Sequence, residues 1–175
     1  MSSATHTYTI ALFTEGLRSL KHILQKAEEH AQTNNVPIND YVSSNLIADM
    51  KPLSFQVFIT ANTAVKAAYR CTSREPPAQE DTDKTFADFY KRIDEALAEL
   101  ESVKPETVQE HEGKSFKAPL GPREFEFTNE SYAVAYAMPN FFFHLVTAYD
   151  ILRARGVPLG KLDYLKDFLK PVGGV

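Results

Sequence analysis

The chain contains a single cysteine, Cys71, and no tryptophan among its 175 residues. One cysteine excludes an intramolecular disulfide framework and any zinc or iron–sulfur site built from several thiolates. The sequence also has no Gly-rich phosphate loop, no Gly-x-Ser-x-Gly motif and no paired His-Glu metalloprotease motif. It therefore lacks the signatures of P-loop proteins, α/β-type serine hydrolases and zinc proteases, and Cys71 is predicted to be a reduced, packed thiol.

Excess positive charge and long apolar runs are missing as well. With 19 Lys and Arg against 23 Asp and Glu, the formal net charge is −4, which disfavours nucleic-acid binding through bulk electrostatics. The densest apolar run, 133–146, is interrupted by Pro139, Asn140 and His144, and it falls short of the roughly 18–20 residues that span a bilayer. The first residues show no signal-peptide pattern. We therefore expect a cytoplasmic protein whose partners include neither nucleic acid nor a membrane.

The composition favours one folded domain. Hydrophobic residues make up 43% of the chain and charged residues 24%, as in ordinary globular proteins, and the length suits a single core. We predict one domain over residues 1–175, in which 1–7 and 170–175 are flexible ends.

Hydrophobic residues recur at steps of three and four along most of the chain, which is the period of amphipathic helices. Between 113 and 128 the period changes, and two short strands flank a Leu120-Gly121-Pro122 turn. We predict a mainly all-α fold, an antiparallel four-helix bundle with a small β-hairpin before the last long helix. The expected helices are 8–34, 52–72, one capped by Asp81-Thr82 and ending near Ser102, 128–155 with a kink at Pro139, and a short terminal helix over 161–169.

A polar row lies on the last long helix, which is otherwise apolar nearly all round. At 100° per residue, Asn140, His144 and Thr147 share one face, and Phe141 flanks it. A helix this apolar is expected at the centre of its bundle, where an unsatisfied buried polar group costs about 1–3 kcal/mol. In one interpretation the row lines a ligand pocket and His144 carries a proton. In the other, His144 is a core histidine that bonds to a neighbouring helix.

The second helix offers a facing wall. Gln56, Thr60 and Thr63 lie together on one flank of its core stripe, where they meet either the polar row or a ligand. Asp49 precedes this helix and is either its N-cap or a carboxylate at the mouth of the pocket. Asn140 and the histidine one turn later have the spacing of paired metal ligands, but asparagine is a poor ligand for zinc. We predict no metal and no other cofactor.

Three stretches resemble one family. They are Leu46-x-x-Asp49-Met50-x-Pro52-Leu53-x-x-Gln56, Pro139-Asn-Phe-Phe-Phe-His144-x-x-Thr147-Ala-Tyr149-x-Ile-Leu-Arg153, and Gly156-Val-Pro-Leu-Gly-Lys161-x-Asp163. Together they resemble the DUF1993 family, a domain of unknown function found in bacteria and filamentous fungi, and the chain looks like a fungal-type member. Because that family belongs to the DinB/YfiT-like superfamily, the resemblance implies a DinB-like four-helix bundle over nearly the whole chain.

The same resemblance implies a changed metal site. Better-known members of the superfamily hold a divalent metal with one histidine from the second helix and a His-x-x-x-His pair from the last. Only His144 matches this pattern, because Asn140 stands at the other position of the pair and Asn62-Thr63 stands where the second-helix histidine is expected. The resemblance therefore implies a bundle that keeps the cavity and has lost the metal.

The first functional hypothesis is a metal-independent small-molecule enzyme. An aromatic-lined cavity between the second and fourth helices would bind an apolar or aromatic substrate, His144 would transfer a proton, and Asn140 and Gln56 would hold a carbonyl or hydroxyl oxygen. Isomerisation, cyclisation or dehydration in a biosynthetic pathway suits these groups. The expected substrate-binding residues are Gln56, Thr60, Thr63, Phe141, Thr147 and Asp49. The alternatives are a non-catalytic binding module, including one that forms a homodimer through its bundle faces, and a residual metal-dependent transferase.

Overall fold

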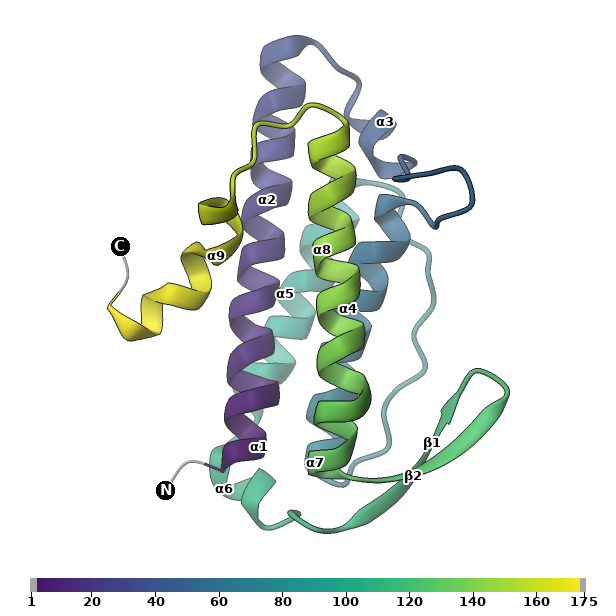
Figure 1. Cartoon of the computed structure of the whole chain (residues 1–175), viewed down its shortest axis with the longest axis vertical. Coiled ribbons are helices and arrows are strands. Elements are labelled where there is room, and N and C mark those ends of the chain that lie inside the picture. Colours follow the sequence, from purple (N-terminus) through teal and green to yellow (C-terminus); the bar gives the residue numbers. More distant parts are fainter. Residues whose placement is uncertain (1–2, 174–175) are drawn as a thin grey trace.

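A computed structural model describes residues 3–173 of the chain as helices around one β-hairpin (Figure 1). The four long helices are α2 (Leu12–Asn34), α4 (Leu53–Cys71), α5 (Phe86–Ser102) and α8 (Met138–Ala154). The short helices are α1 (Ala4–His6), α3 (Ile38–Val42), α6 (Pro105–Gln109), α7 (Asn129–Tyr132) and α9 (Lys161–Leu169). Two π-helical turns, η1 (Thr7–Ala11) and η2 (Ala133–Ala137), precede α2 and α8, and a 3-10 turn, η3 (Lys170–Val172), follows α9. The predicted four-helix bundle with a hairpin is confirmed.

The bundle has two upward and two downward helices in Figure 1. Helices α2 and α8 run upward, and both are antiparallel to α4. Helix α5 runs in the same direction as α4, because the long connection 72–85 returns along the outside of the bundle. The expected cap at Asp81-Thr82 is wrong, since Thr85 accepts from the Asp88 backbone N–H and forms a capping box with it.

The hairpin pairs β1 (Ser115–Leu120) with β2 (Arg123–Thr128) in antiparallel register, with Ser115 opposite Thr128 and Leu120 opposite Arg123. Its turn needs Gly121, which has a φ of 61°. Thr128 then caps α7, its hydroxyl accepting from the Ser131 backbone N–H. The hairpin, at the lower right of Figure 1, is therefore followed directly by the helical segment that leads into α8.

Regular α-helix resumes at Met138, directly before Pro139, where the sequence predicts a kink. Proline has no N–H to donate to the preceding turn, and here it occupies the first turn of α8, directly after the wide turn η2. The polar row thus begins at the point where regular α-helix resumes.

The bundle core is filled by aromatic and aliphatic side chains. The rings of Phe13 and Phe141 stack with centroids 4.4 Å apart and an interplanar angle of 20°, and both side chains are fully buried. Gly16 lies beneath this stack, where a Cβ would collide with the Phe141 ring. Helices α2 and α8 approach closely at this point because position 16 has no side chain.

Cys71 is the packed thiol that the sequence predicts. It is fully buried at the end of α4, and burial raises the pKa of its thiol to about 11, against the opposing effect of a hydrogen bond with Thr9. A thiol of this kind stays protonated and is a poor nucleophile at neutral pH.

The ends expected to be flexible lie partly outside the described residues, namely 1, 2, 174 and 175. In the described part of these ends, α1 and η3 form helical turns. No helix within residues 3–173 combines the length and the apolar character needed to cross a bilayer.

Candidate functional site

Two hydrogen bonds join α4 to α8. His144 Nδ1 lies 2.7 Å from Gln56 Oε1, and one turn earlier on α8 the Asn140 amide donates to Thr63 Oγ1 over 2.8 Å. Gln56 and Thr63 are almost completely buried, at 2% and 5% exposed. We call these four residues the α4–α8 seam. Two of the partner pairs that the sequence analysis considered are therefore brought together.

Gln56 determines which nitrogen of His144 carries the proton. The Gln56 amide nitrogen donates to the Lys51 carbonyl over 2.8 Å, so its Oε1 faces His144 as an acceptor. Nδ1 of His144 is then the N–H donor, and Nε2 is left with an unshared lone pair. Among the described residues, no protein group bonds to Nε2 and the atom is not sealed from solvent. An incoming molecule can therefore donate a hydrogen bond to it.

Burial keeps His144 neutral. It lowers the pKa of the imidazole from 6.5 to about 4, because the charged form loses hydration between two helices. At neutral pH the ring is thus a hydrogen-bond acceptor and a weak base.

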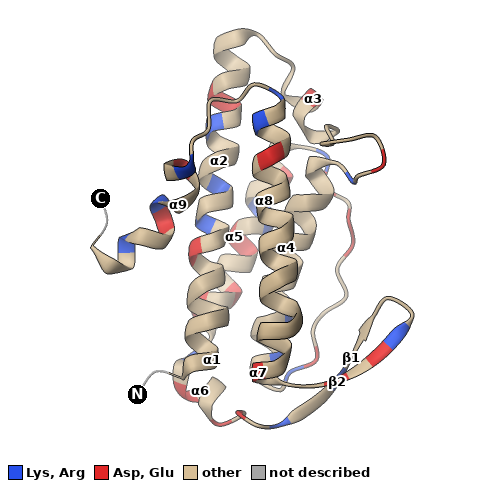
Figure 2. Ribbon diagram, viewed as in Figure 1, with Lys and Arg blue, Asp and Glu red and all other residues tan. Residues whose placement is uncertain are grey.

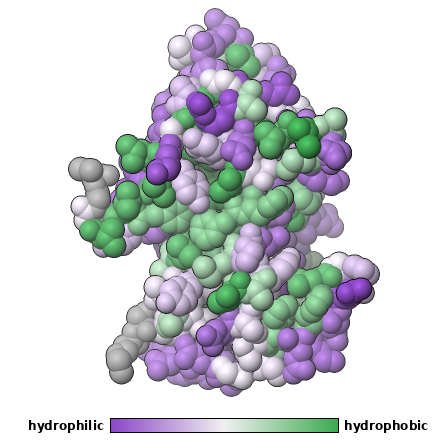
Figure 3. Space-filling view, in the orientation of Figure 1, coloured by the Kyte–Doolittle hydropathy of each residue, from purple (hydrophilic) through white to green (hydrophobic). Residues whose placement is uncertain are grey.

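Apolar surface surrounds the exposed edge of His144. Phe55 and Phe143 meet the imidazole edge to face, with centroids 5.9 and 5.1 Å away. Phe143 is 59% exposed and Val146 40% exposed. Charged residues of α8 occur only towards its C-terminal end (Figure 2), and Figure 3 shows a band of apolar surface across the middle of the molecule, where α8 lies in Figure 1. This surface suits an apolar or aromatic ligand.

The remaining predicted site residues form no hydrogen bond with the His144 imidazole. The hydroxyl groups of Thr60 and Thr147 donate to the carbonyls of Gln56 and Phe143 in their own helices. Phe141 is buried against α2. Asp49 is exposed in the loop before α4, and it is not the N-cap, because Pro52 occupies that position and α4 has no side-chain cap.

Sequence analysis missed Phe55 and Phe143. Phe55 directly precedes Gln56, and Phe143 directly precedes His144, so each ring flanks a residue that the analysis had singled out. The position of each phenylalanine next to a predicted site residue could have identified it. The helical periodicity did not, because it groups residues three and four positions apart.

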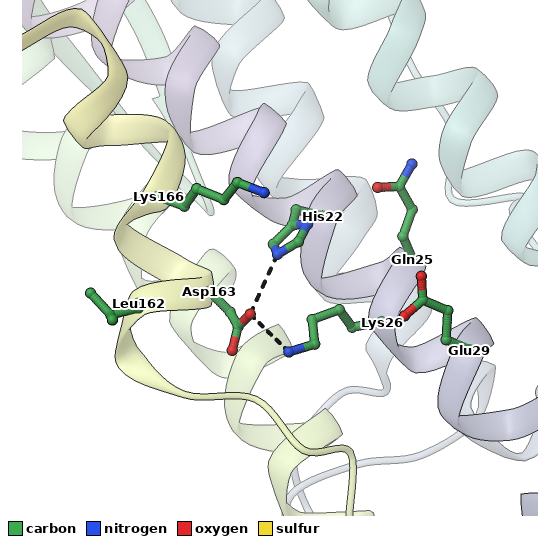
Figure 4. Close-up of a pocket in the computed structure, with 7 residues that line it drawn as sticks. All are labelled: His22, Gln25, Lys26, Glu29, Leu162, Asp163 and Lys166. Carbon is green, nitrogen blue, oxygen red and sulfur yellow. Dashed lines mark hydrogen bonds and ion pairs between the residues drawn. The ribbon is translucent and has the colours of Figure 1, made fainter. Parts of the chain in front are cut away.

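Neither His144 nor Asn140 lines any of five prominent hollows on the described surface. The largest, of about 420 Å³, lies between α2 and α9 (Figure 4). There Asp163 accepts the Gly160 N–H over 2.7 Å and pairs with Lys26 at 2.8 Å and with His22 at 3.4 Å. These contacts cap α9 and attach it to α2.

We expect Asp163→Ala to lower the free energy of unfolding by about 1–2 kcal/mol, because it removes a helix cap and the ion pairs that hold α9. Urea denaturation measures this loss, and amide hydrogen exchange should accelerate selectively in α9. Asp94→Ala is the control, since Asp94 makes only an exposed ion pair with Lys21, and it should cost less than about 0.5 kcal/mol. Equal losses in the two variants would contradict the capping role.

The residues of the α4–α8 seam do not fit a three-histidine metal site. Within the described part of the chain, no group of three or more His, Cys, Asp and Glu side chains is placed to hold a metal ion. Nδ1 of His144 already bonds to Gln56, and the Asn140 amide donates to Thr63. No step of the chemistry proposed below passes through a metal.

Comparison with known proteins supports the fold. A family model described as "Domain of unknown function (DUF1993)" matches residues 5–165. The chain is also similar to the crystal structure of a DinB family member protein from Shewanella denitrificans, with a TM-score of 0.83 and 32% sequence identity over 91% of this chain and 90% of that chain. No curated protein shows significant similarity to the chain. The predicted DinB-like bundle is thereby confirmed.

Proposed function

The chain belongs to the DUF1993 family, and from that premise we propose that it binds an apolar or aromatic small molecule at the α4–α8 seam and acts on it without a metal. The observation that carries this proposal is the free Nε2 of a neutral His144, held in one tautomer by Gln56 and flanked by Phe55 and Phe143.

The seam suggests a role for each residue. Nε2 of His144 accepts a proton or a hydrogen bond from a hydroxyl or an acidic C–H of the substrate. Both polar groups of Gln56 are engaged, so Gln56 positions the imidazole and does not touch the substrate. The carbonyl oxygen of Asn140, one helical turn away, remains available to a ligand donor. Isomerisation, cyclisation or dehydration is the reaction class that these groups support.

A second candidate is binding without catalysis. A base with a pKa of about 4 takes a full proton poorly at neutral pH, because its basicity lies well below the operating pH. The same property makes Nε2 a good acceptor for a ligand hydroxyl. The two candidates share one site and differ only in whether a product forms.

The experiment is a thermal-shift screen with phenols and aromatic ketones, followed by calorimetry and product analysis of each binder. We expect His144→Ala to weaken binding about tenfold and to abolish any product, since the lost hydrogen bond contributes about 1–1.5 kcal/mol. His111→Ala is the control, because His111 bonds to Thr107 outside the seam.

Each outcome of the screen separates the candidates. Product that disappears in His144→Ala supports the enzyme, and tight binding without product supports the binding module. Binding that is equally strong in wild type and His144→Ala would contradict both the enzyme and the binding module. Sedimentation velocity on the free protein checks whether a second copy covers Phe143 and Val146.

A further inference from the structure

A second polar cluster lies at the opposite end of α4 from Gln56. The connection after α4 and strand β1 enclose a hollow of about 360 Å³ there, beside the hairpin at the lower right of Figures 1 and 2. Its lining includes four cationic side chains and one acidic one, which are Arg70, Arg74, Lys114, Lys117 and Glu75. In a chain whose net charge is −4, this is a local concentration of positive charge.

Arg70 is held in place by rings and not by a carboxylate. Its guanidinium carbon lies 4.6 Å from the centroid of Tyr132 and 5.6 Å from that of Phe116. Among the described residues, no acidic side chain forms an ion pair with it. Stacking fixes the plane of a guanidinium but satisfies few of its five N–H donors. The Arg70 guanidinium is therefore held in a fixed orientation, and most of its N–H groups are available to a ligand.

Two neighbours of Arg70, Lys66 and Tyr132, are also buried or half-buried polar groups beside this unpaired charge. Lys66 is half-buried one turn earlier on α4 and has no acidic partner among the described residues, and burial and the Arg70 charge together lower the pKa of its ammonium group. The Tyr132 hydroxyl is buried beside Arg70, and the guanidinium opposes the rise in the Tyr132 pKa that burial causes. Lys66 and Arg70 lie at positions i and i+4, where like charges repel each other. No acidic side chain among the described residues offsets this repulsion by pairing with either of them.

The other cations differ in how far they are neutralised. Arg74 pairs with Glu99 at 2.6 Å, and Lys117 pairs with Glu124 at 3.2 Å. Lys114 is exposed and makes no ion pair among the described residues. The positive charge of the hollow that no described acidic side chain neutralises thus belongs to Arg70 and Lys114.

We infer that this hollow binds the oxyanion of a small molecule, a phosphate or a carboxylate, with Arg70 as its principal ligand. The planar fork of arginine matches two oxygens of either group, and Lys114, which also lines the hollow, adds a second positive charge. The site lies 14 residues along α4 from Gln56, or about 21 Å at 1.5 Å per residue, so it is independent of the function proposed for His144.

The test is a titration of the ¹⁵N-labelled protein with inorganic phosphate and, separately, with acetate at constant ionic strength. We expect saturable shifts of the Arg70 side-chain Nε–H and of the amides of residues 114–117. Arg70→Gln should weaken binding at least about tenfold, since charge-assisted hydrogen bonds are the strong ones. Lys91→Gln on the exposed face of α5 should leave the affinity unchanged.

Because Arg70 also packs on rings, a second variant keeps the inference falsifiable if Arg70→Gln fails to fold. Lys114→Gln with Lys117→Gln changes only exposed side chains and should weaken binding several-fold. Saturation with phosphate alone assigns a phosphate ligand, and saturation with acetate alone assigns a carboxylate. Shifts that do not saturate, or that weaken equally in Lys91→Gln, would overturn the site.

Discussion

Phe141→Ala is expected to lower the free energy of unfolding by about 3–5 kcal/mol, the loss typical of a large aromatic removed from a packed core. The Phe141 ring is fully buried, stacks on Phe13 and covers Gly16. Its removal leaves a cavity between α2 and α8, and the backbone at Gly16 offers no side chain to fill it. Urea denaturation monitored by circular dichroism measures the effect.

Phe143→Ala is the matched control on the same helix. Phe143 is 59% exposed, so the variant should cost less than about 1 kcal/mol. It should instead weaken ligand binding at His144, which Phe143 flanks. Equal losses of stability in the two variants would mean that α8 does not present Phe141 to α2.

The contrast between these two rings marks the limit of the sequence analysis. The stretch 141–143 is Phe-Phe-Phe in a helix that is apolar nearly all round, so periodicity cannot say which ring faces the core. Phe141 was predicted to line a pocket, and the structure places it in the core because α2 carries a glycine at position 16. Only the packing of two distant helices reveals that preference.

Other features were accessible because local chemistry determines them. The hairpin turn at Gly121, the cap at Thr128 and the helix restart beside Pro139 each follow from one residue type and its backbone preference. The start of α5 was missed because Thr82 and Thr85 are both good N-caps. Asp88 decides between them by completing the capping box with Thr85.

The polar row was predictable as a set, but its partners were not. Because buried polar groups form hydrogen bonds, the polar row was expected to have partners such as Gln56 and Thr63. This rule does not say whether Gln56 and Thr63 bond to α8 or to a ligand. The structure resolves this for Nδ1 of His144 and for the Asn140 amide. The lone pair on Nε2 of His144 and the carbonyl oxygen of Asn140 remain as acceptors, and they define the candidate site.

That same histidine is expected to make the protein less stable in mild acid. Its pKa is lowered from 6.5 to about 4 in the folded state, so between these values only the unfolded state binds the proton. Stability is therefore complete above pH 6.5 and falls as the pH decreases towards 4. The full shift corresponds to at most about 3.4 kcal/mol at 1.36 kcal/mol per unit. We expect about 1–2 kcal/mol, because water reaches the Nε2 edge of the ring.

The measurement is the free energy of unfolding in urea between pH 7 and pH 4.5 for the wild type and for His144→Gln. The two proteins differ only at position 144, so the difference between the two curves isolates the contribution of His144. The wild type should lose about 1–2 kcal/mol more than the variant over this range. Parallel curves would show that His144 is protonated as readily in the fold as in the unfolded chain. The neutral tautomer held by Gln56, on which the proposed chemistry depends, would then have no support.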